Sequence, residues 1–399
     1  MSHYKYLILG AGMTADAAAR AIRKADSHGS IGLISMELVP PYDRPPLTKD
    51  LWKGKEIESI WRKTEDLDVT FHFGRVIQSL DVDAKSVTDD AGQVYTYEKL
   101  LLATGGTPRK FPFDDERIIY FRTLQDYQRL RALTEQGNHF AVVGGGFIGS
   151  EIAAALAMNG KQVSMIFPQK TIGARMFPMD LGLFLNNYYG EKGVDIYPES
   201  SVTSIKAEGQ LLLLELQDQP PLLVDAVVAG IGIQPNIELA EKAGLLVGDG
   251  ILVDEFLCTN NPDIYAAGDV AFFYSPVLGK RIRVEHEDNA RMMGKFAGRN
   301  MAGQHTPYLH QPFFYSDLFD LSYEAVGQVD SRLETFSDWD EPYRKGVIYY
   351  LEDQRVRGVL LWNVQHQLDA ARKLIAEPGP FRPEDLRDRL PWNLFAHLI

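Results

Sequence analysis

A strand–glycine–helix pattern that occurs twice constrains this chain most strongly. Each copy is an apolar run, a G-x-G-x-x-G/A turn and an Ala-rich segment, at residues 6–15 and 140–149. A further β-like run follows each copy, at 31–35 and 162–167. This βαβ unit binds the pyrophosphate of a dinucleotide at the start of its helix. Two copies therefore predict two nucleotide sites.

Each position of the motif has a physical reason. In the first copy, Gly10 permits a tight turn, Gly12 lets a pyrophosphate approach the backbone, and Ala15 lets the helix pack on the strand. The alternative interpretation is a strand–helix turn without a ligand. The matching residues of the second copy are Gly144, Gly146 and Gly149, with Phe147 and Ile148 opening its helix.

Two acidic residues follow strands that belong to the first site. Glu37, just after the run 31–35, can accept hydrogen bonds from ribose hydroxyls. Met36 occupies the adjacent position, so the alignment of this chain with the motif is open by one residue. Asp269 follows Gly268 at a strand end, where a carboxylate can bind a polyol chain. The alternatives are an exposed loop glutamate and an aspartate that caps the next helix.

Composition narrows the class of protein. A length of 399 residues predicts two or three domains, and the one cysteine, Cys258, excludes an internal disulfide or dithiol centre. A net charge of −13 argues against nucleic acid as a partner. We see no signal peptide and no apolar run near the roughly 20 residues that span a bilayer. We therefore expect a soluble, cytoplasmic protein without a membrane span.

The order of motifs predicts a discontinuous first domain. Strand-to-glycine passages at 97–106, 227–232 and 264–269 indicate that the chain leaves the first unit, forms the second and returns. The tail from 305 alternates aromatic and polar residues and then predicts a helix at 368–375. We predict a first nucleotide domain at 1–112 and 231–305, a second at 113–230, and an α+β C-terminal domain at 306–399 that forms an interface or dimer.

Residues 41–49, PYDRPPLTK, resemble the P-Y-x-R-P-P-L-S/T-K signature of one branch of flavin reductases. That branch contains ferredoxin, putidaredoxin and rubredoxin reductases and apoptosis-inducing factor. The resemblance covers essentially the whole chain. Its other landmarks lie at 102–106, 230–236 and 264–270, and the segments 313–318, 323–327, 359–364 and 370–375 are most similar to the apoptosis-inducing-factor branch.

The resemblance implies an α/β fold with two Rossmann-like nucleotide-binding domains of the glutathione-reductase type and an α+β C-terminal domain. It implies FAD in the first site and NADH or NADPH in the second, and no metal. Motif and resemblance together predict FAD contacts from Gly10, Gly12, Ala15, Glu37, Arg44, Lys49, Ala103, Thr104, Gly105, Gly268, Asp269, Glu285, His286 and Tyr315. They predict NAD(P)H contacts from Gly144, Gly146, Phe147, Ile148, Gly149, Glu151, Gln169, Lys170 and Gly232.

Three residues are candidates for catalysis. By resemblance Lys49 lies near the flavin, where a cation stabilises negative charge that develops during reduction, and Glu151 pairs with it. Two unrelated surface charges are the alternative. His286 is either a proton donor or a histidine satisfied at a helix start. Tyr315 stands where relatives often carry Trp, and it either stacks near the nicotinamide side of the flavin or packs as a core aromatic.

Related disulfide reductases carry a reactive cysteine pair beside the flavin, but the matching segment here, 44–49, has none. Cys258 is distant in sequence and unpaired. Disulfide exchange and cysteine-dependent peroxide chemistry are thereby excluded. Electrons must leave the reduced flavin directly.

The second site differs from the matching site of related proteins at the position that binds the ribose. An acid there binds the 2′-hydroxyl and repels the 2′-phosphate of NADPH, but this chain has Phe167 and then Gln169, where relatives often carry Glu. Lys170 and Arg175 can pair with a phosphate. We therefore predict that both NADH and NADPH serve as donors.

The sequence leaves the electron acceptor open, and three functions remain as alternatives. The leading one is an NAD(P)H oxidoreductase with a quinone, oxygen or unknown acceptor. The second is a ferredoxin or rubredoxin reductase. A basic stripe on one helix face would then dock an acidic carrier, and it consists of Arg291, Lys295 and Arg299, which are four residues apart. The alternative is an ordinary solvated helix face. The third is an interaction protein whose dimer state the nucleotide switches.

Overall fold

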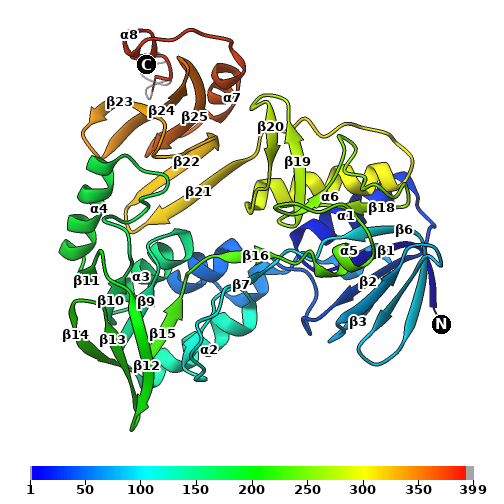
Figure 1. Cartoon of the computed structure of the whole chain (residues 1–399), viewed down its shortest axis with the longest axis horizontal. Helices are drawn as coiled ribbons and strands as arrows, with labels where there is room; N and C mark the ends of the chain where they lie inside the picture. Colours follow the sequence, from blue (N-terminus) through cyan, green and yellow to red (C-terminus); the bar gives the residue numbers. More distant parts are fainter. Residues whose placement is uncertain (1, 392–399) are drawn as a thin grey trace. The chain divides into compact units, whose positions relative to one another are not determined.

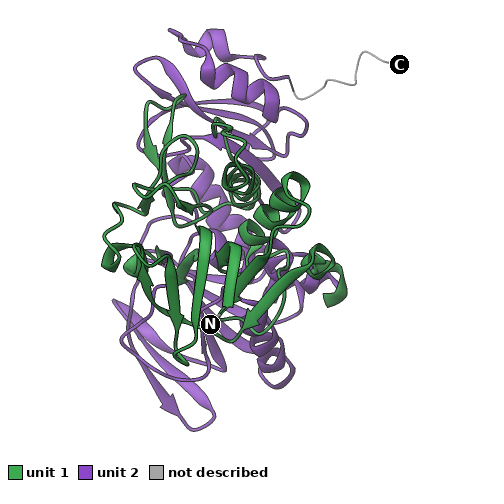
Figure 2. Cartoon of the chain, turned by 90° about the vertical axis from the view of Figure 1, so that its right-hand side faces the viewer, with its two compact units in different colours: residues 1–44, 56–107, 234–312 green, residues 45–55, 108–233, 313–399 purple. Residues whose placement is uncertain are grey.

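The computed structural model describes residues 2–391, and the chain divides into two units, coloured separately in Figure 2. Unit 1 comprises Met1–Arg44, Glu56–Thr107 and Gln234–Pro312. Unit 2 comprises Pro45–Lys55, Pro108–Ile233 and Phe313–Ile399. The chain passes from one unit to the other within two strands, β7 (Gly106–Pro108) and β16 (Ile233–Pro235). These two strands pair with each other.

Unit 1 is built on a seven-stranded sheet whose central strands are parallel (Figure 1). The strand β1 lies between β2 and β6, so the strand order reverses beside the first glycine turn, which is where open α/β sheets bind ligands. The parallel strands are β3 (Val69–Phe73), β2 (Ile31–Ser35), β1 (Ser2–Leu9), β6 (Val94–Leu102) and β18 (Ile264–Ala266), and β4 (Ile77–Asp81) with β5 (Ser86–Asp89) adds an antiparallel edge.

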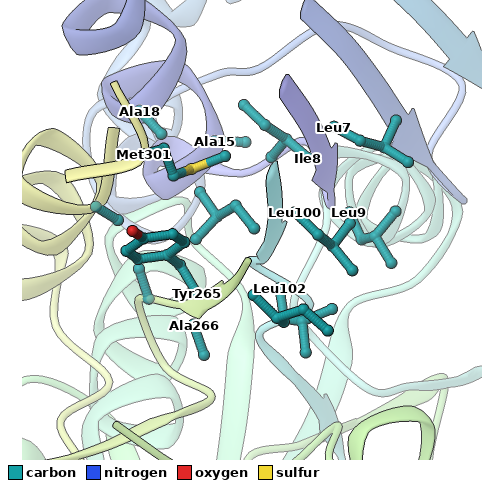
Figure 3. Close-up of a cluster of buried hydrophobic side chains, with 14 of the residues drawn as sticks. Leu7, Ile8, Leu9, Ala15, Ala18, Leu100, Leu102, Tyr265, Ala266 and Met301 are labelled. Atoms are coloured by element: carbon teal, nitrogen blue, oxygen red, sulfur yellow. The ribbon is translucent and has the colours of Figure 1, made fainter. Parts of the chain in front are cut away.

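Two helices cross closely over this sheet, α1 (Met13–Ala25) and α6 (Glu287–Met301). A Cβ on Gly294 would lie 2.2 Å from the Thr14 carbonyl oxygen, and one on Gly298 would lie 2.4 Å from that of Ala18, so only glycine permits this approach. Figure 3 shows the core beneath, where Leu7 and Leu100 have no exposed surface. Each such side chain contributes roughly 2 kcal/mol through burial.

Smaller elements complete unit 1. They are α5 (Glu238–Lys242), the three-stranded sheet of β17 (Ile251–Leu252), β19 (Ala271–Ser275) and β20 (Lys280–Ile282), and the 3-10 helices η3 (Ile57–Ile60) and η4 (Thr64–Leu67).

Unit 2 contains the second parallel sheet, in the order β11-β10-β9-β15-β8. Its strands are β11 (Val194–Tyr197), β10 (Gln162–Ile166), β9 (His139–Val143), β15 (Ala226–Ala229) and β8 (Ile118–Ile119). Its helices are α2 (Leu124–Gln136), α3 (Phe147–Met158) and α4 (Met179–Glu191), and an antiparallel sheet is formed by β12 (Val202–Glu208), β13 (Leu211–Leu216) and β14 (Gln219–Val224).

The C-terminal part of unit 2 is a five-stranded antiparallel sheet, as the alternating tail predicts (Figure 1). Phe314 lies edge-on to Phe147 at the start of α3, with ring centroids 5.4 Å apart. The sheet comprises β21 (Phe313–Leu318), β22 (Leu321–Gly327), β25 (Arg355–Trp362), β24 (Lys345–Glu352) and β23 (Glu334–Glu341), followed by α7 (Leu368–Ala376), which packs on β22 and β25, and α8 (Pro383–Leu386).

The second half of the signature segment lies within unit 2, in the 3-10 helix η1 (Pro45–Thr48), and the 3-10 helix η2 (Asp50–Lys53) follows it. Trp52 lies edge-on to Tyr127 of α2, with ring centroids 5.6 Å apart. Asn159, just after α3, donates to the Trp52 carbonyl at 3.2 Å. These contacts hold the segment after Lys49 against α2 and the C-terminal end of α3.

The α/β class predicted from the sequence is confirmed, with two Rossmann-like parallel sheets and an antiparallel C-terminal sheet. Across residues 2–391, no helix combines the length and apolar character that crossing a bilayer requires.

Candidate active site

The first glycine turn, in unit 1, leaves space at one position and none at another. Gly10 has φ +117°, and a Cβ there would lie 2.2 Å from the Ala103 carbonyl oxygen. A Cβ on Gly12 would meet no other heavy atom of residues 2–391 within 4 Å. Ala15 is fully buried. The turn is closed toward the sheet and open at the start of α1.

The second turn, in unit 2, has the same geometry. Gly144 also has φ +117°, and its Cβ would lie 2.3 Å from the Gly230 carbonyl oxygen, whereas Gly146 is open. A Cβ on Gly149 would lie 1.8 Å from the Gly144 carbonyl oxygen. Within the described chain, no side chain caps the N-terminus of α1 or α3. Open space at a helix N-terminus fits an anionic pyrophosphate at each turn.

Glu37 is held by two residues of the signature segment. Its carboxylate accepts from the Tyr42 hydroxyl at 2.6 Å and pairs with Arg44 at 2.5 Å. Met36 is 71% exposed. Burial disfavours the charge of Arg44, but Tyr42, Glu37 and Asp269 together raise the pKa of Arg44 above its usual value. The structure thus brings together three of the predicted FAD residues: Glu37, Arg44 and Asp269.

A buried ion-pair network that the sequence analysis did not identify anchors the same segment. Asp16 of α1 is fully buried and accepts from Arg62 Nε at 2.7 Å and Thr64 Oγ1 at 2.7 Å. Arg62 also pairs with Asp43 of the signature. The signal available in the sequence is a carboxylate directly after Ala15, in a run of alanines that packs on the sheet. Asp43 therefore has a structural role.

His286 is the N-cap residue of α6. Burial lowers the pKa of His286 to about 4, and the charges of Asp269 and Asp288 offset only part of this shift. The imidazole is therefore neutral at pH 7. Glu285 pairs with Arg283 at 2.5 Å, and a Cβ on Gly268 would lie 2.4 Å from Thr14 Oγ1.

The loop after β6 is fixed by a side chain from a distant segment of unit 1. Asn236 Nδ2 donates to the Thr104 carbonyl at 2.8 Å, and the Thr104 hydroxyl donates to the Asn236 carbonyl at 3.1 Å. Gly105 follows with φ +62°. In unit 2, Gly232 has φ +94° and accepts from the Arg109 amide at 2.9 Å.

Lys49 and Glu151 form the predicted ion pair within unit 2. Lys49 Nζ lies 2.6 Å from Glu151 Oε1, and the two side chains are 9% and 5% exposed. The Ser316 hydroxyl donates to the same oxygen at 2.5 Å, and the Thr48 hydroxyl donates to Oε2 at 2.5 Å. The sequence analysis did not identify either hydroxyl, although each directly adjoins a predicted site residue.

Aromatic residues surround this pair. Lys49 Nζ lies 5.4 Å from the Tyr315 ring centroid, a distance at which a cation is attracted to the ring. Burial, and then the charge of Glu151, raises the pKa of Tyr189 and of Tyr323 well above their usual value. Both phenols are therefore neutral neighbours of the pair.

At the predicted ribose position, Phe167 is fully buried and packs under Gly145, whose Cβ would lie 3.1 Å from the ring. Gln169 is half-buried, and Lys170 and Arg175 are exposed. Gln169 is the first polar side chain after β10 that is available to a ribose.

The surroundings of Cys258 disfavour its thiolate form. The half-buried thiol lies 3.5 Å from the Asn261 carbonyl oxygen, and burial raises the pKa of Cys258 to about 11. In the part of the chain that the structure describes, no group of three His, Cys, Asp or Glu side chains could hold a metal ion.

The basic stripe of α6 is partly engaged. Arg291 is exposed and pairs with Glu287 at 3.2 Å, Lys295 is exposed, and Arg299 stacks on Phe296 with 5.7 Å between guanidinium carbon and ring centroid. Docking of a carrier on this stripe stays a prediction.

The chain is similar to known protein families over most of its length. The family described as "Pyridine nucleotide-disulphide oxidoreductase" matches residues 4–294. The chain belongs to this family. A second family, "Apoptosis-inducing factor, mitochondrion-associated, C-term", matches residues 297–342 and 336–377.

Individual relatives of this pyridine nucleotide-disulphide oxidoreductase cover nearly the whole chain. Apoptosis-inducing factor 1, mitochondrial, of Dictyostelium discoideum is 35% identical over 94% of this chain and 79% of its own. The anthranilate 1,2-dioxygenase system ferredoxin–NAD(+) reductase component of Burkholderia cepacia is 32% identical over 97% and 98%. Putidaredoxin reductase, in a covalent complex with putidaredoxin, matches with TM-score 0.90 and 26% identity over 98% of both chains.

The chain is thus an FAD- and NAD(P)H-dependent oxidoreductase of the apoptosis-inducing-factor and ferredoxin-reductase group. It has two nucleotide-binding domains and an antiparallel C-terminal domain. Despite the name of the pyridine nucleotide-disulphide oxidoreductase family, it has no redox disulfide, because it contains one cysteine.

Proposed function

We propose that the chain takes a hydride from NADH or NADPH onto FAD and passes the electrons from the flavin directly to an external acceptor. The buried Lys49–Glu151 pair carries this proposal, because a fixed cation beside the second nucleotide motif suits a reaction in which negative charge develops. FAD, when bound, supplies the two-electron acceptor.

Glycine turns and acidic side chains supply the binding groups. The open position at Gly12 admits a pyrophosphate to α1, with Glu37 near the ribose and Asp269 near the polyol chain of FAD. The open position at Gly146 admits the pyrophosphate of the nicotinamide nucleotide to the start of α3. The remaining predicted residues line these two positions: Arg44, Ala103, Thr104, Gly105, Gly268, Glu285 and His286 for FAD, and Phe147, Ile148, Gln169, Lys170 and Gly232 for NAD(P)H.

Lys49 holds a positive charge for the isoalloxazine, and Tyr315 shields the same place with its ring. Glu151 keeps the ammonium in position and reduces the cost of burying it. In unit 1, His286 is neutral at pH 7 and acts toward FAD as a hydrogen-bonding group.

A protein carrier is the second candidate for the acceptor. The Burkholderia relative is a ferredoxin–NAD(+) reductase component, and putidaredoxin reductase is seen with putidaredoxin. The first candidate is an oxidoreductase of the apoptosis-inducing-factor branch that reduces a quinone, oxygen or another small acceptor, and the match to the C-terminal family of apoptosis-inducing factor supports that branch.

The test is purification followed by anaerobic stopped-flow reduction. We expect a yellow protein with noncovalent FAD that NADH and NADPH both bleach, and turnover with at least one of ferricyanide, a quinone, oxygen or a ferredoxin. A folded, colourless protein that takes up no FAD would refute the proposal.

A further inference from the structure

We infer that Ser316 and Thr48 are positioning residues for hydride transfer, acting through Glu151 on Lys49. This inference rests on the proposed function, since it assigns residues that hold the cation at the reacting flavin. This role requires no contact of either hydroxyl with FAD or nicotinamide. Their effect depends on the carboxylate that both of them bind.

The geometry points to a carboxylate held from three sides. Ser316 is buried on β21 and donates to Glu151 Oε1 at 2.5 Å, the oxygen that Lys49 Nζ approaches at 2.6 Å. Thr48 donates to Oε2 at 2.5 Å and lies 3.2 Å from the Pro45 carbonyl. The shorter contact of Thr48 is therefore to the carboxylate.

The two donors have different effects on Lys49. Ser316 shares an oxygen with the ammonium, so its loss lets Lys49 Nζ shift along the carboxylate. Thr48 precedes Lys49 in the chain, so its bond to Oε2 fixes the backbone from which the lysine extends. Hydrogen bonds to a charged carboxylate are short and strong, so the two donors together hold Glu151 in one orientation.

The other groups that face Glu151 do not titrate near neutral pH. Tyr189 of α4 and Tyr323 of β22 have pKa values raised well above the usual range by burial and then by Glu151. Tyr315 approaches Lys49 through its ring. Hydride transfer oxidises NAD(P)H to NAD(P)⁺ and moves both electrons together with the hydrogen, so no proton passes through Ser316 or Thr48.

The experiment compares Ser316→Ala and Thr48→Val with Thr48→Ser, which keeps the hydroxyl. Ser322→Ala is the matched control, because Ser322 lies on the neighbouring strand β22 and its hydroxyl binds Asn363 at 3.1 Å instead. All are studied as FAD-loaded enzymes. The readouts are the reduction rate at saturating NADH, the flavin midpoint potential, and acylation of Lys49 followed by mass spectrometry.

We expect Ser316→Ala and Thr48→Val each to slow reduction about tenfold with little change in the half-saturating NADH concentration. The midpoint potential should become more negative, and Lys49 should be acylated faster. Thr48→Ser and Ser322→Ala should behave as wild type.

Failure of the inference and failure of the proposed function give different results. If wild type binds no FAD or is not reduced, the proposed function is wrong. If wild type is reduced and both hydroxyl-lacking variants match it in rate, potential and labelling, the positioning role is wrong. Lower thermal stability with unchanged potential and labelling would also overturn it, since that result indicates a purely structural role.

Discussion

Lys49 and Glu151 form a buried ion pair, 2.6 Å apart, with side chains only 9% and 5% exposed. Removing one partner of such a pair leaves an uncompensated buried charge, which costs about 3–5 kcal/mol. We therefore expect the pair to contribute both to the free energy of unfolding and to the rate of flavin reduction, and experiments can measure these two contributions separately.

Lys49→Met should slow flavin reduction by about 10²-fold, because a preorganised charge at the reacting centre is lost. The free energy of unfolding should also fall, and Lys49→Met/Glu151→Leu should recover part of it without recovering the rate. Stopped-flow reduction and urea unfolding measure the two effects.

The control is Lys55→Met in the same segment, where an exposed lysine pairs with Asp50 at 2.6 Å. Exposed pairs contribute about 0–1 kcal/mol, so this variant should change neither quantity appreciably. Wild-type reduction rates in Lys49→Met would show that the lysine has no part in the reaction.

Gln169→Glu should shift nucleotide choice toward NADH, because a carboxylate after β10 repels the 2′-phosphate of NADPH. Each 1.4 kcal/mol of differential binding changes the ratio of kcat/KM about tenfold. The same change at exposed Gln162, at the start of β10, is the control. If wild type already rejects NADPH by several orders of magnitude, a residue other than Gln169 reads the ribose.

Charge reversal of Arg291, Lys295 and Arg299 tests the carrier hypothesis. If a ferredoxin-like carrier docks on this stripe, its KM should rise and the salt dependence should flatten, while turnover with ferricyanide stays constant. Reversal of exposed Lys24 on α1 is compared with each single reversal in the stripe and controls for the same change in net charge. An unchanged KM for the carrier would leave the stripe as a solvated helix face.

His286 should make stability fall on acidification. Its pKa is about 4 in the folded chain, against 6.5 for a histidine without these surroundings, so the unfolded chain binds the proton more readily between these values. Stability lost as pH falls from about 6.5 to about 4 should amount to roughly 1.4 kcal/mol per unit of separation. His286→Gln should remove this part of the slope, whereas His28→Gln, at an exposed site, should not. Equal slopes in wild type and His286→Gln would contradict the assignment.

The sequence alone determined the two glycine turns and the order of the elements. This was possible because the constraints are local: Gly10 and Gly144 have positive φ, and in each the Cβ would collide with a carbonyl at the end of a neighbouring strand. Strand alternation likewise predicted the antiparallel C-terminal sheet, and the lack of a second cysteine excluded a redox disulfide.

Only the tertiary structure decided what surrounds Glu151. Its hydroxyl donors lie 103 and 165 residues away in sequence, and no local pattern specifies that Thr48 and Ser316 point to one carboxylate. The same holds for Asp16, whose partner Arg62 comes from a different segment. Side-chain direction and burial at such sites follow from how separate elements pack, because a buried charge persists only where distant donors converge on it.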